Sequence, residues 1–232
     1  MATLGLIGSG LIGSTLARIA VDRGLDVVLS NSRGPETLAD LVAELGPRAT
    51  AGTSREAAAA GDWVVVTIPL KAYEQVPREP LVGKTVLDTN NYYPQRDGNL
   101  PRLDSGETTS SELLQGHLEG AHVVKAFNNI FFKHLAELPR ATGAADRTAL
   151  PIAGDDAEAK ARATELLDIL GFDTVDAGSL AEGWRFQPGT PAYGEPFAGR
   201  AEGEASGTAF MEAPAGAASV ADIEEALAAA RR

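Results

Sequence analysis

Short apolar runs alternate with segments of helical periodicity along most of the chain. The run Trp63–Ile68 (WVVVTI) is continuous and rich in β-branched residues, as in a strand that is buried on both faces. Alternation of strand-like and helix-like segments predicts a mostly parallel sheet with helices on both faces. We predict further strands at residues 26–30, 49–51, 85–88, 122–127, 150–153 and 172–176.

Residues that commonly begin or end helices bound the segments between these runs. Two segments open with capping boxes, Thr53–Glu56 (TSRE) and Thr109–Glu112 (TSSE), in which a hydroxyl and a carboxylate each accept from a backbone N–H. Glycines follow several segments, where a helix commonly stops. We therefore predict helices over 11–23, 35–45, from 53 to near 61, from 109 to near 120, over 155–170, and over 220–231 with Ser219 as its cap.

A glycine motif follows the first apolar run. Gly8, Gly10 and Gly13 form the pattern GxGxxG between a predicted strand and a predicted helix. In this context the first glycine allows a tight turn, the second lets a phosphate approach the backbone, and the third lets the helix pack on the strand. The free N–H groups at the helix N-terminus then favour an anion. The motif predicts dinucleotide binding, with a purely structural turn as the alternative.

The loop after the second predicted strand indicates which dinucleotide is bound. An NAD-binding protein commonly places Asp or Glu there to accept from the ribose 2′-hydroxyl. This chain has Ser30, Asn31, Ser32 and Arg33 instead, all of which can donate to a 2′-phosphate, and arginine can do so with two parallel bonds. The loop therefore favours NADP(H). An ordinary polar turn before Gly34 is the alternative.

These signals predict an α/β protein with a Rossmann-type, doubly wound, mostly parallel sheet and a small C-terminal portion. We expect an NADP-binding domain over 1–145, a small C-terminal α/β portion over 146–187, and an arm with a terminal helix over 188–232. Residues 188–218 are rich in Gly, Pro, Ala and Glu without strong periodicity, which is typical of an extended or loosely ordered segment. Such an arm either wraps around a partner subunit or is mobile.

Composition excludes several classes of function. The formal net charge of −12 argues against nucleic acid and anionic membranes as partners. There are no cysteines, and the three histidines lack the spacing of metal ligands, so we expect no metal site. No apolar run approaches the length of a membrane span, and the first residues do not resemble a signal peptide. We therefore expect a cytoplasmic protein.

Polar and apolar side chains follow three neighbouring strands at the edge where a doubly wound sheet binds ligands. A nicotinamide needs a flat apolar floor and amide partners for its carboxamide. The residues that match this need are Ile68, Pro69, Leu70, Asn90, Phe127 and Asn128. Ordinary loop chemistry is the alternative, because Asn and Pro are common after strands.

Side chains suited to proton transfer are scarce at this edge. The chain has no YxxxK grouping of a catalytic tyrosine and lysine. Lys125 and Tyr92 are the candidate catalytic residues. Lys125 would act as an acid or an electrostatic clamp, or would simply pair with a carboxylate. The scarcity favours direct hydride transfer between two bound cofactors, which depends mainly on proximity and orientation.

Four stretches of the chain resemble the coenzyme F420-dependent NADP oxidoreductase family: the GxGxxG opening, the Ser-Asn-Ser-Arg loop, Val-Val-Lys-Ala-Phe-Asn-Asn at 123–129, and Ile-Ala-Gly-Asp-Asp at 152–156. The similarity covers about residues 3–186 and extends distantly to the NADPH-binding domain of membrane ferric reductases. It implies a homodimer that exchanges a hydride between NADP(H) and a deazaflavin, and a flavin is the alternative partner. It also implies a role for each of these residues: Ser9, Gly10, Leu11 and Ile12 at the diphosphate, Ser32 and Arg33 at the 2′-phosphate, and Ile68, Pro69, Asn90, Ala126, Phe127 and Asn128 around the two rings.

The loop Asn90–Gly98 departs from the family pattern. Its Tyr92 and Tyr93 would stack on a deazaflavin or flavin, or would exclude it in favour of a smaller substrate. Trp184, Arg185 and Phe186 would close the same pocket, or these aromatic residues would pack the small C-terminal portion.

Two other functions share the cofactor site. One is a reductase of a small imine or carbonyl substrate, with Lys125 or Tyr92 as proton donor. The other is a non-catalytic NADP(H)-sensing module whose C-terminal arm meets a partner.

Overall fold

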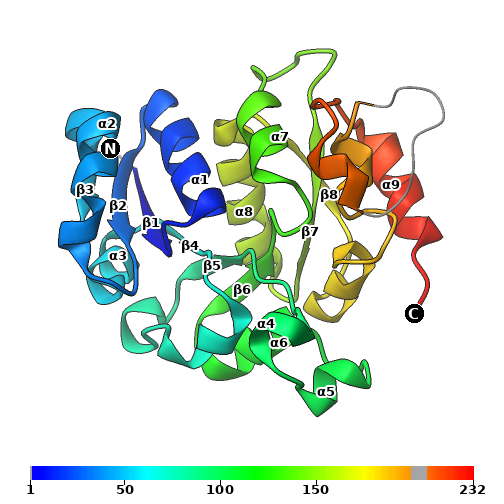
Figure 1. The fold of residues 1–232 in the computed structure, drawn as a ribbon, viewed down its shortest axis with the longest axis horizontal. Helices are drawn as coiled ribbons and strands as arrows, with labels where there is room; N and C mark the ends of the chain where they lie inside the picture. The colour runs from blue at the N-terminus through cyan, green and yellow to red at the C-terminus, as the bar shows by residue number, and fades with distance from the viewer. Residues whose placement is uncertain (1, 200–207) are drawn as a thin grey trace.

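The computed structural model describes residues 2–199 and 208–232 (Figure 1). Within these residues eight strands form one sheet in the order β3-β2-β1-β4-β5-β6-β7-β8. The strands are β1 (Thr3–Ile7), β2 (Asp26–Ser30), β3 (Ala49–Ala51), β4 (Trp63–Val66), β5 (Thr85–Asp88), β6 (His122–Lys125), β7 (Ala149–Gly154) and β8 (Asp173–Asp176). Neighbours run parallel except β6 and β7, so the expected Rossmann-type, mostly parallel sheet is confirmed.

The order of the strands in the sheet changes direction at β1. β2 and β3 lie on one side of β1, and β4, β5 and β6 lie on the other. In such sheets the loops after the strands diverge at this point and leave a crevice beyond the carboxyl ends. The fold therefore places the ligand-binding edge at the loops after β1, β4, β5 and β6.

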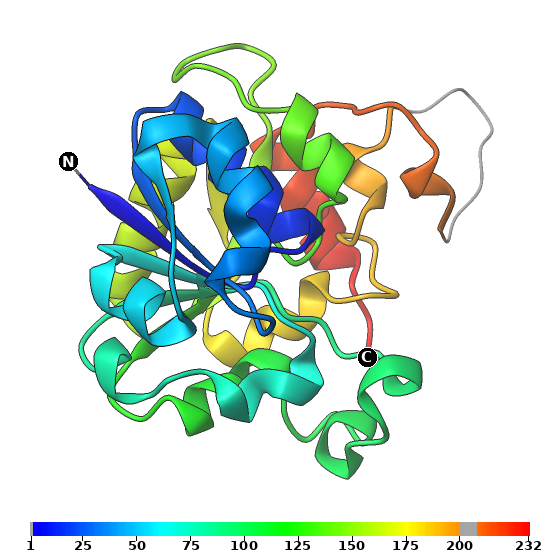
Figure 2. The same ribbon diagram turned by 60° about the vertical axis from the view of Figure 1, so that its left-hand side comes forward.

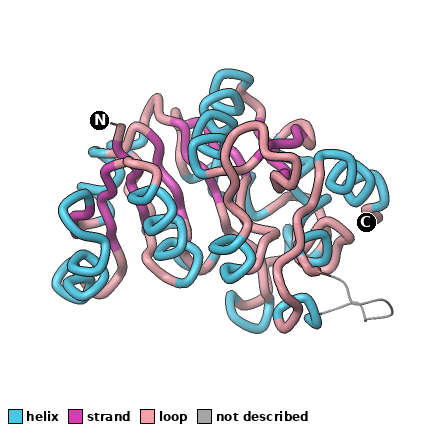
Figure 3. The backbone as a smooth tube through the Cα atoms, turned by 90° about the horizontal axis from the view of Figure 1, so that it is seen from above, coloured by secondary structure: helices cyan, strands magenta, loops and turns pink. Residues whose placement is uncertain are grey.

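Helices cover both faces of the sheet, as the views in Figures 2 and 3 show. A large apolar core includes residues of α1, α7, α8 and α9, with α2 packed against it, and a second, smaller core includes residues of α3 and α6. The α-helices are α1 (Leu11–Asp22), α2 (Ala39–Leu45), α3 (Ser54–Ala60), α4 (Pro94–Asp97), α5 (Pro101–Asp104), α6 (Ser110–His117), α7 (Phe132–Glu137), α8 (Ala157–Leu170) and α9 (Val220–Ala229). Short 3-10 helices are η1 (Pro35–Leu38), η2 (Gly46–Arg48), η3 (Leu70–Gln75), η4 (Glu79–Leu81), η5 (Leu180–Phe186), η6 (Glu195–Phe197) and η7 (Thr208–Met211).

The local signals at the helix ends act as predicted. Thr53, Thr109 and Ser219 each form a capping box with the residue three positions later. Gly171 ends α8 in the left-handed conformation. The strands β4 and β6 end two residues earlier than predicted, because the chain leaves the sheet there to form the loops of the ligand-binding edge.

β7 is antiparallel to β6 and pairs with it through Val124–Gly154 and Lys125–Ala153. All six residues of β7 are buried, and a continuous apolar run does not encode strand direction. β7, α8 and β8 extend the sheet of the first six strands, and the expected boundary at 145/146 falls in the loop before β7.

The described part of the expected arm packs against its own chain. Phe197 and Ala192 are fully buried, and the N–H of Ala149 in β7 donates to the carbonyl of Ala218 at 2.8 Å. Within this Gly/Pro-rich stretch the side chains of Ala192, Phe197 and Ala218 are therefore used for packing. Residues 200–207, also part of the expected arm, lie outside the described residues.

Candidate functional site

The turn between β1 and α1 (the glycine turn, residues 8–13) has the geometry that the glycine motif predicts. Gly8 has a φ of 107°, and a Cβ atom there would lie 2.4 Å from the carbonyl oxygen of Thr67. A Cβ atom on Gly13 would lie 2.2 Å from the carbonyl oxygen of Gly8. A Cβ atom on Gly10 would meet nothing within 4 Å, and no side chain caps α1. Open space therefore adjoins the free N–H groups at the N-terminus of α1, as a diphosphate requires.

The loop after β2 carries the predicted 2′-phosphate donors. The side chain of Asn31 accepts from the N–H of Arg33 at 2.9 Å and donates to the hydroxyl of Thr37 at 2.8 Å, which holds the loop in shape. Ser32 and Arg33 are exposed, and the guanidinium of Arg33 has no ion-pair partner among the described residues. Ser9 and Ser30 instead use their hydroxyls inside the fold, on the carbonyls of Ser30 and Leu6.

A cleft of about 410 Å³ lies at the ligand-binding edge of the sheet. Half of the sixteen residues predicted to hold the cofactor line it. Leu70 and Ala126 are fully buried, and the other predicted residues outside the lining are Gly8, Ser9, Gly13, Asn31, Ser32 and Arg33. The lining consists of Gly10, Leu11, Ile12, Thr67, Ile68, Pro69, Thr89, Asn90, Asn91, Tyr93, Arg96, Phe127, Asn128, Asn129, Ile130, Phe131, Phe132, Tyr193, Phe210 and Met211. None of these described lining residues is Asp, Glu, His or Lys.

Asn90 presents an unpaired carboxamide to this cleft. The residue is only 2% exposed, and neither its Oδ1 nor its Nδ2 has a hydrogen-bond partner. Its backbone is held firmly, because its N–H donates to Oδ1 of Asp88 at 2.9 Å and its carbonyl accepts from Nζ of Lys125 at 2.9 Å. A buried amide without partners is unfavourable by about 1–3 kcal/mol, so the side chain is suited to pair with a ligand.

Lys125 lies beneath the cleft and does not line it. Its side chain is 1% exposed, and its Nζ also contacts the hydroxyls of Ser110 and Ser111 at 3.2 Å. Ser111 in turn donates to Oδ2 of Asp88 at 2.6 Å. Burial lowers the pKa of Lys125 and raises the pKa of Asp88, and their mutual attraction opposes both shifts. Of the roles left open for Lys125, the structure shows the pairing with a carboxylate, bridged by Ser111, rather than an acid in contact with substrate.

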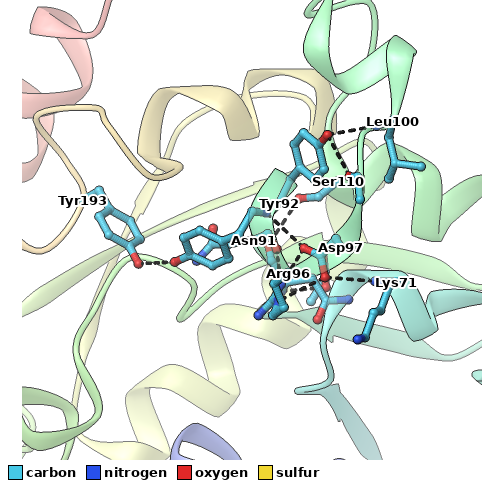
Figure 4. Close-up of polar contacts among 12 residues, drawn as sticks. Lys71, Asn91, Tyr92, Arg96, Asp97, Leu100, Ser110 and Tyr193 are labelled. Atoms are coloured by element: carbon cyan, nitrogen blue, oxygen red, sulfur yellow. Dashed lines mark hydrogen bonds and ion pairs between the residues drawn. The ribbon is translucent and has the colours of Figure 1, made fainter.

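Tyr92 also points away from the cleft. Its hydroxyl donates to Asp104 at 2.7 Å and accepts from the N–H of Leu100 at 2.9 Å (Figure 4). Partial burial and the neighbouring Asp104 carboxylate raise the pKa of Tyr92. The hydroxyl that was a candidate proton donor is therefore used to hold the loop around α4 and α5.

Tyr93, Arg96 and Tyr193 also line the cleft. The sequence analysis placed Tyr93 beside a second ring and assigned neither Arg96 nor Tyr193 to the site. The hydroxyls of Tyr93 and Tyr193 lie 2.6 Å apart. The guanidinium of Arg96 lies 4.9 Å from the centre of the Tyr93 ring and pairs with Asp97 at 2.8 Å (Figure 4). In the sequence, Tyr193 stands out only as an aromatic residue within the Gly/Pro-rich stretch. The residues that it meets in the cleft are distant in sequence, so no local pattern assigns it to the site.

The loop after β6 connects the cleft to the C-terminal segment. Phe127 has a φ of 59°, the only positive value of a non-glycine residue within the described ranges, and such strain is often found at functional sites. Asn129 donates to the carbonyl of Ala192 at 2.7 Å and accepts from the N–H of Gly194 at 2.8 Å. The chain around Tyr193 is thereby fixed to the floor of the cleft.

The aromatic cluster Trp184–Phe186 packs the C-terminal portion. Phe186 is fully buried, its carbonyl accepts from Asn128 at 2.8 Å, and Trp184 stacks with Arg185 and Arg232 outside the lining of the cleft. Across residues 2–199 and 208–232 no three His, Cys, Asp or Glu side chains gather as a metal site would need. In the same part of the chain, every helix is too short or too polar to cross a membrane.

Comparison with known proteins finds a family model and relatives that resemble this chain. Residues 3–92 match the model of the family described as NADP oxidoreductase, coenzyme F420-dependent. The rat (Rattus norvegicus) protein Metalloreductase STEAP3 is 32% identical over 180 residues, which are 77% of this chain and 34% of the rat protein. The chain therefore spans about a third of that relative's length.

Two solved structures are similar over most of the chain. The hypothetical protein SMa0349 from Sinorhizobium meliloti is 31% identical with a TM-score of 0.71, and the match covers 83% of this chain and 93% of that one. A proposed F420-dependent NADP reductase from Arthrobacter sp. FB24 is 27% identical with a TM-score of 0.64, over 77% of this chain and 85% of the other.

The substitution Gly10→Ala tests the phosphate approach. Because a Cβ atom there meets no protein atom, the thermal midpoint of unfolding should stay unchanged, while calorimetry should show NADPH affinity reduced about tenfold, or roughly 1.4 kcal/mol. Gly13→Ala is the matched control, since its Cβ would meet the Gly8 carbonyl and should lower the midpoint. Undiminished NADPH binding by Gly10→Ala would contradict this assignment.

The substitution Lys125→Met leaves the Asp88 carboxyl buried without its charged partner. We expect the free energy of unfolding in urea to fall by about 3–5 kcal/mol. The double variant Asp88→Asn/Lys125→Met carries no buried charge and should recover at least half of that loss. A single variant as stable as the unmodified protein would show that the pair does not hold this region together.

Proposed function

Because this chain belongs to the coenzyme F420-dependent NADP oxidoreductase family, we propose that it transfers a hydride between NADP(H) and a deazaflavin of the F420 type, or a flavin. One observation carries the proposal: a single cleft joins the open glycine turn to the unpaired carboxamide of Asn90. The family membership supports an NADP-dependent oxidoreductase, and the identity of the second substrate is our inference.

The chain offers a partner for each part of NADP(H). The diphosphate would lie at Gly10, Leu11 and Ile12, where backbone N–H groups of α1 are free, and the 2′-phosphate would lie between Ser32 and Arg33. The nicotinamide would rest on Ile68, Pro69 and Phe127. Asn90, together with Asn128, whose Oδ1 is also buried and unpaired, would pair with its carboxamide.

The lining of the cleft fits a transfer that needs little acid–base catalysis. NADPH supplies a hydride, so that it becomes NADP⁺ while the acceptor ring gains two electrons and takes up one proton from water. The protein's part is to hold the two rings face to face and to exclude bulk water. The apolar and amide side chains of the lining are suited to this, and none of its described members is a carboxylate, lysine or histidine.

A reductase of a small imine or carbonyl substrate is the second candidate. It needs a proton donor inside the cleft, and the hydroxyls of Tyr93 and Tyr193 lie there, in place of the Lys125 and Tyr92 considered from sequence. Loss of turnover of such a substrate in Tyr93→Phe would favour this function. We further propose a cytoplasmic homodimer, for which the family resemblance and the acidic composition are the support.

Mixing the protein with NADPH and oxidised coenzyme F420 tests the main proposal. We expect the visible absorption band of the deazaflavin to bleach, with one NADPH consumed for each ring reduced. Calorimetry with NADPH alone is the control for an active cofactor site. If NADPH binds and neither the deazaflavin nor a flavin is reduced, this function is excluded.

The substitution Arg33→Ala tests the choice of NADP(H) over NAD(H). The loss of one charge-assisted pair, roughly 1.5–3 kcal/mol, should lower NADPH affinity about tenfold or more and leave NADH affinity nearly unchanged. Arg18→Ala, which removes a guanidinium from α1 that pairs with Glu44, is the matched control. Equal weakening of both nucleotides in Arg33→Ala would show that this side chain does not recognise the phosphate.

A further inference from the structure

Two tyrosines from distant parts of the chain close the outer end of the cleft. Tyr93 follows β5 and Tyr193 belongs to the C-terminal segment, and their hydroxyls are joined by a hydrogen bond of 2.6 Å (Figure 4). Both residues line the cleft beside Phe131, Phe132 and Phe210. We refer to Tyr93 and Tyr193 as the tyrosine wall.

Each side of the tyrosine wall is held by its own contacts. On the Tyr193 side, the ring of Phe210 meets Tyr193 edge-on, with centres 5.7 Å apart and planes at 89°. Gly194 has a φ of 77°, and a Cβ atom there would lie 2.7 Å from the Phe210 ring, so this position requires glycine. The two hydrogen bonds to Asn129 hold the backbone on either side of Tyr193.

On the Tyr93 side, the stacked guanidinium of Arg96 is fixed by the fully buried side chain of Asp97. The same carboxylate accepts from the N–H of Tyr93 at 3.0 Å and from the N–H of Lys71 at 3.4 Å. The carbonyl of Asn91 accepts from Arg96 at 2.8 Å. Tyr93 is therefore held by contacts within its own loop, and Asp97 links that loop to Lys71 of η3, so Tyr93 resists displacement by a ligand.

The tyrosine wall keeps one hydrogen-bond donor. Burial raises the pKa of Tyr193 well above its usual range, and the bond to Tyr93 reinforces the shift, so the Tyr193 hydroxyl is protonated at neutral pH. Two hydroxyls that share one hydrogen bond have one O–H left to donate. At this end the cleft therefore offers aromatic faces, one neutral donor and the guanidinium of Arg96.

We propose that Tyr93 and Tyr193 select the second substrate, admitting a flat, slim heteroaromatic ring that carries a hydrogen-bond acceptor at its edge and excluding bulkier rings. The inference rests on the proposed hydride transfer to a second ring in the same cleft. The second ring would share the cleft of about 410 Å³ with the nicotinamide end of NADP(H), and the tyrosine wall, which is held on both sides, would limit the width of that ring.

Two deazaflavins with the same tail test this selection. One is 8-hydroxy-5-deazariboflavin, which is slim and has an acceptor oxygen, and the other is 7,8-dimethyl-5-deazariboflavin, which is wider. The measured quantity is the ratio of kcat/KM for the dimethyl ring to kcat/KM for the hydroxy ring, compared between each variant and the unmodified protein. This comparison removes the intrinsic difference in reactivity between the two rings.

We expect Tyr193→Ala to raise this ratio about tenfold, because the space for two methyl groups opens and the donor to the hydroxy ring is lost. Tyr193→Phe keeps the ring and removes one hydroxyl, so the ratio should rise about threefold. NADPH affinity should be unchanged in both variants. Tyr73→Phe, which removes a hydroxyl that contacts Glu74 outside the cleft, is the matched control and should leave the ratio unchanged.

An unchanged ratio in Tyr193→Ala, with both rings still reduced, would overturn the selection. A fall in NADPH affinity with an unchanged ratio would also overturn it, because the tyrosine wall would then belong to the cofactor subsite. Failure of the proposed function is a separate result, in which the unmodified protein binds NADPH and reduces neither ring. Tyr193→Phe, which preserves the packing of the ring, keeps the test decisive if Tyr193→Ala does not fold.

Discussion

The site depends on the close approach of three backbone segments at the glycine turn. These segments are the end of β1 at Gly8, the first turn of α1 at Gly13 and the residue after β4, Thr67. The hydroxyl of Thr67, just after β4, donates to the carbonyl of Gly8 at 2.7 Å, and the same carbonyl lies where a Cβ atom of Gly13 would be. Because no side chain separates these segments, α1 begins directly beside the loop after β4. Its free N–H groups and the apolar floor at Ile68 and Pro69 therefore belong to one cleft, which a dinucleotide can span.

The loop after β6 joins three parts of the site that are remote in sequence. Lys125 points beneath the cleft and holds the carbonyl of Asn90, Phe127 adopts a strained conformation in the lining, and Asn129 fixes the C-terminal segment. Residues 123–129, which resemble the coenzyme F420-dependent family, thus hold other parts of the site in place. Lys125 donates directly to the backbone carbonyl of Asn90, and the hydroxyl of Ser111 links the same lysine to Asp88.

Local signals in the sequence determined much of the fold and of the cofactor half of the site. Thr53, Thr109 and Ser219 begin helices as predicted, because a capping box involves only four consecutive residues. Gly8 and Gly13 have the tight surroundings that the motif predicts, since the turn, the strand and the helix that it joins are adjacent in the chain. The predicted strands have the right places because burial on both faces of a parallel sheet selects continuous apolar runs.

Only the tertiary structure decided which side chains after the strands reach the cleft. Tyr92 and Tyr93 are neighbours with the same chemistry, and the path of the loop through α4 turns one toward Asp104 and the other toward Tyr193. The burial of Lys125, the antiparallel direction of β7 and the placement of residues 192–194 against Asn129 likewise depend on contacts between distant segments. The sequence by itself determined the strands, the longer helices and the glycine turn, because short-range hydrogen bonding and burial act within a few residues. It did not predict α4, α5 or α7, and the acceptor side of the cleft required segments about a hundred residues apart to meet.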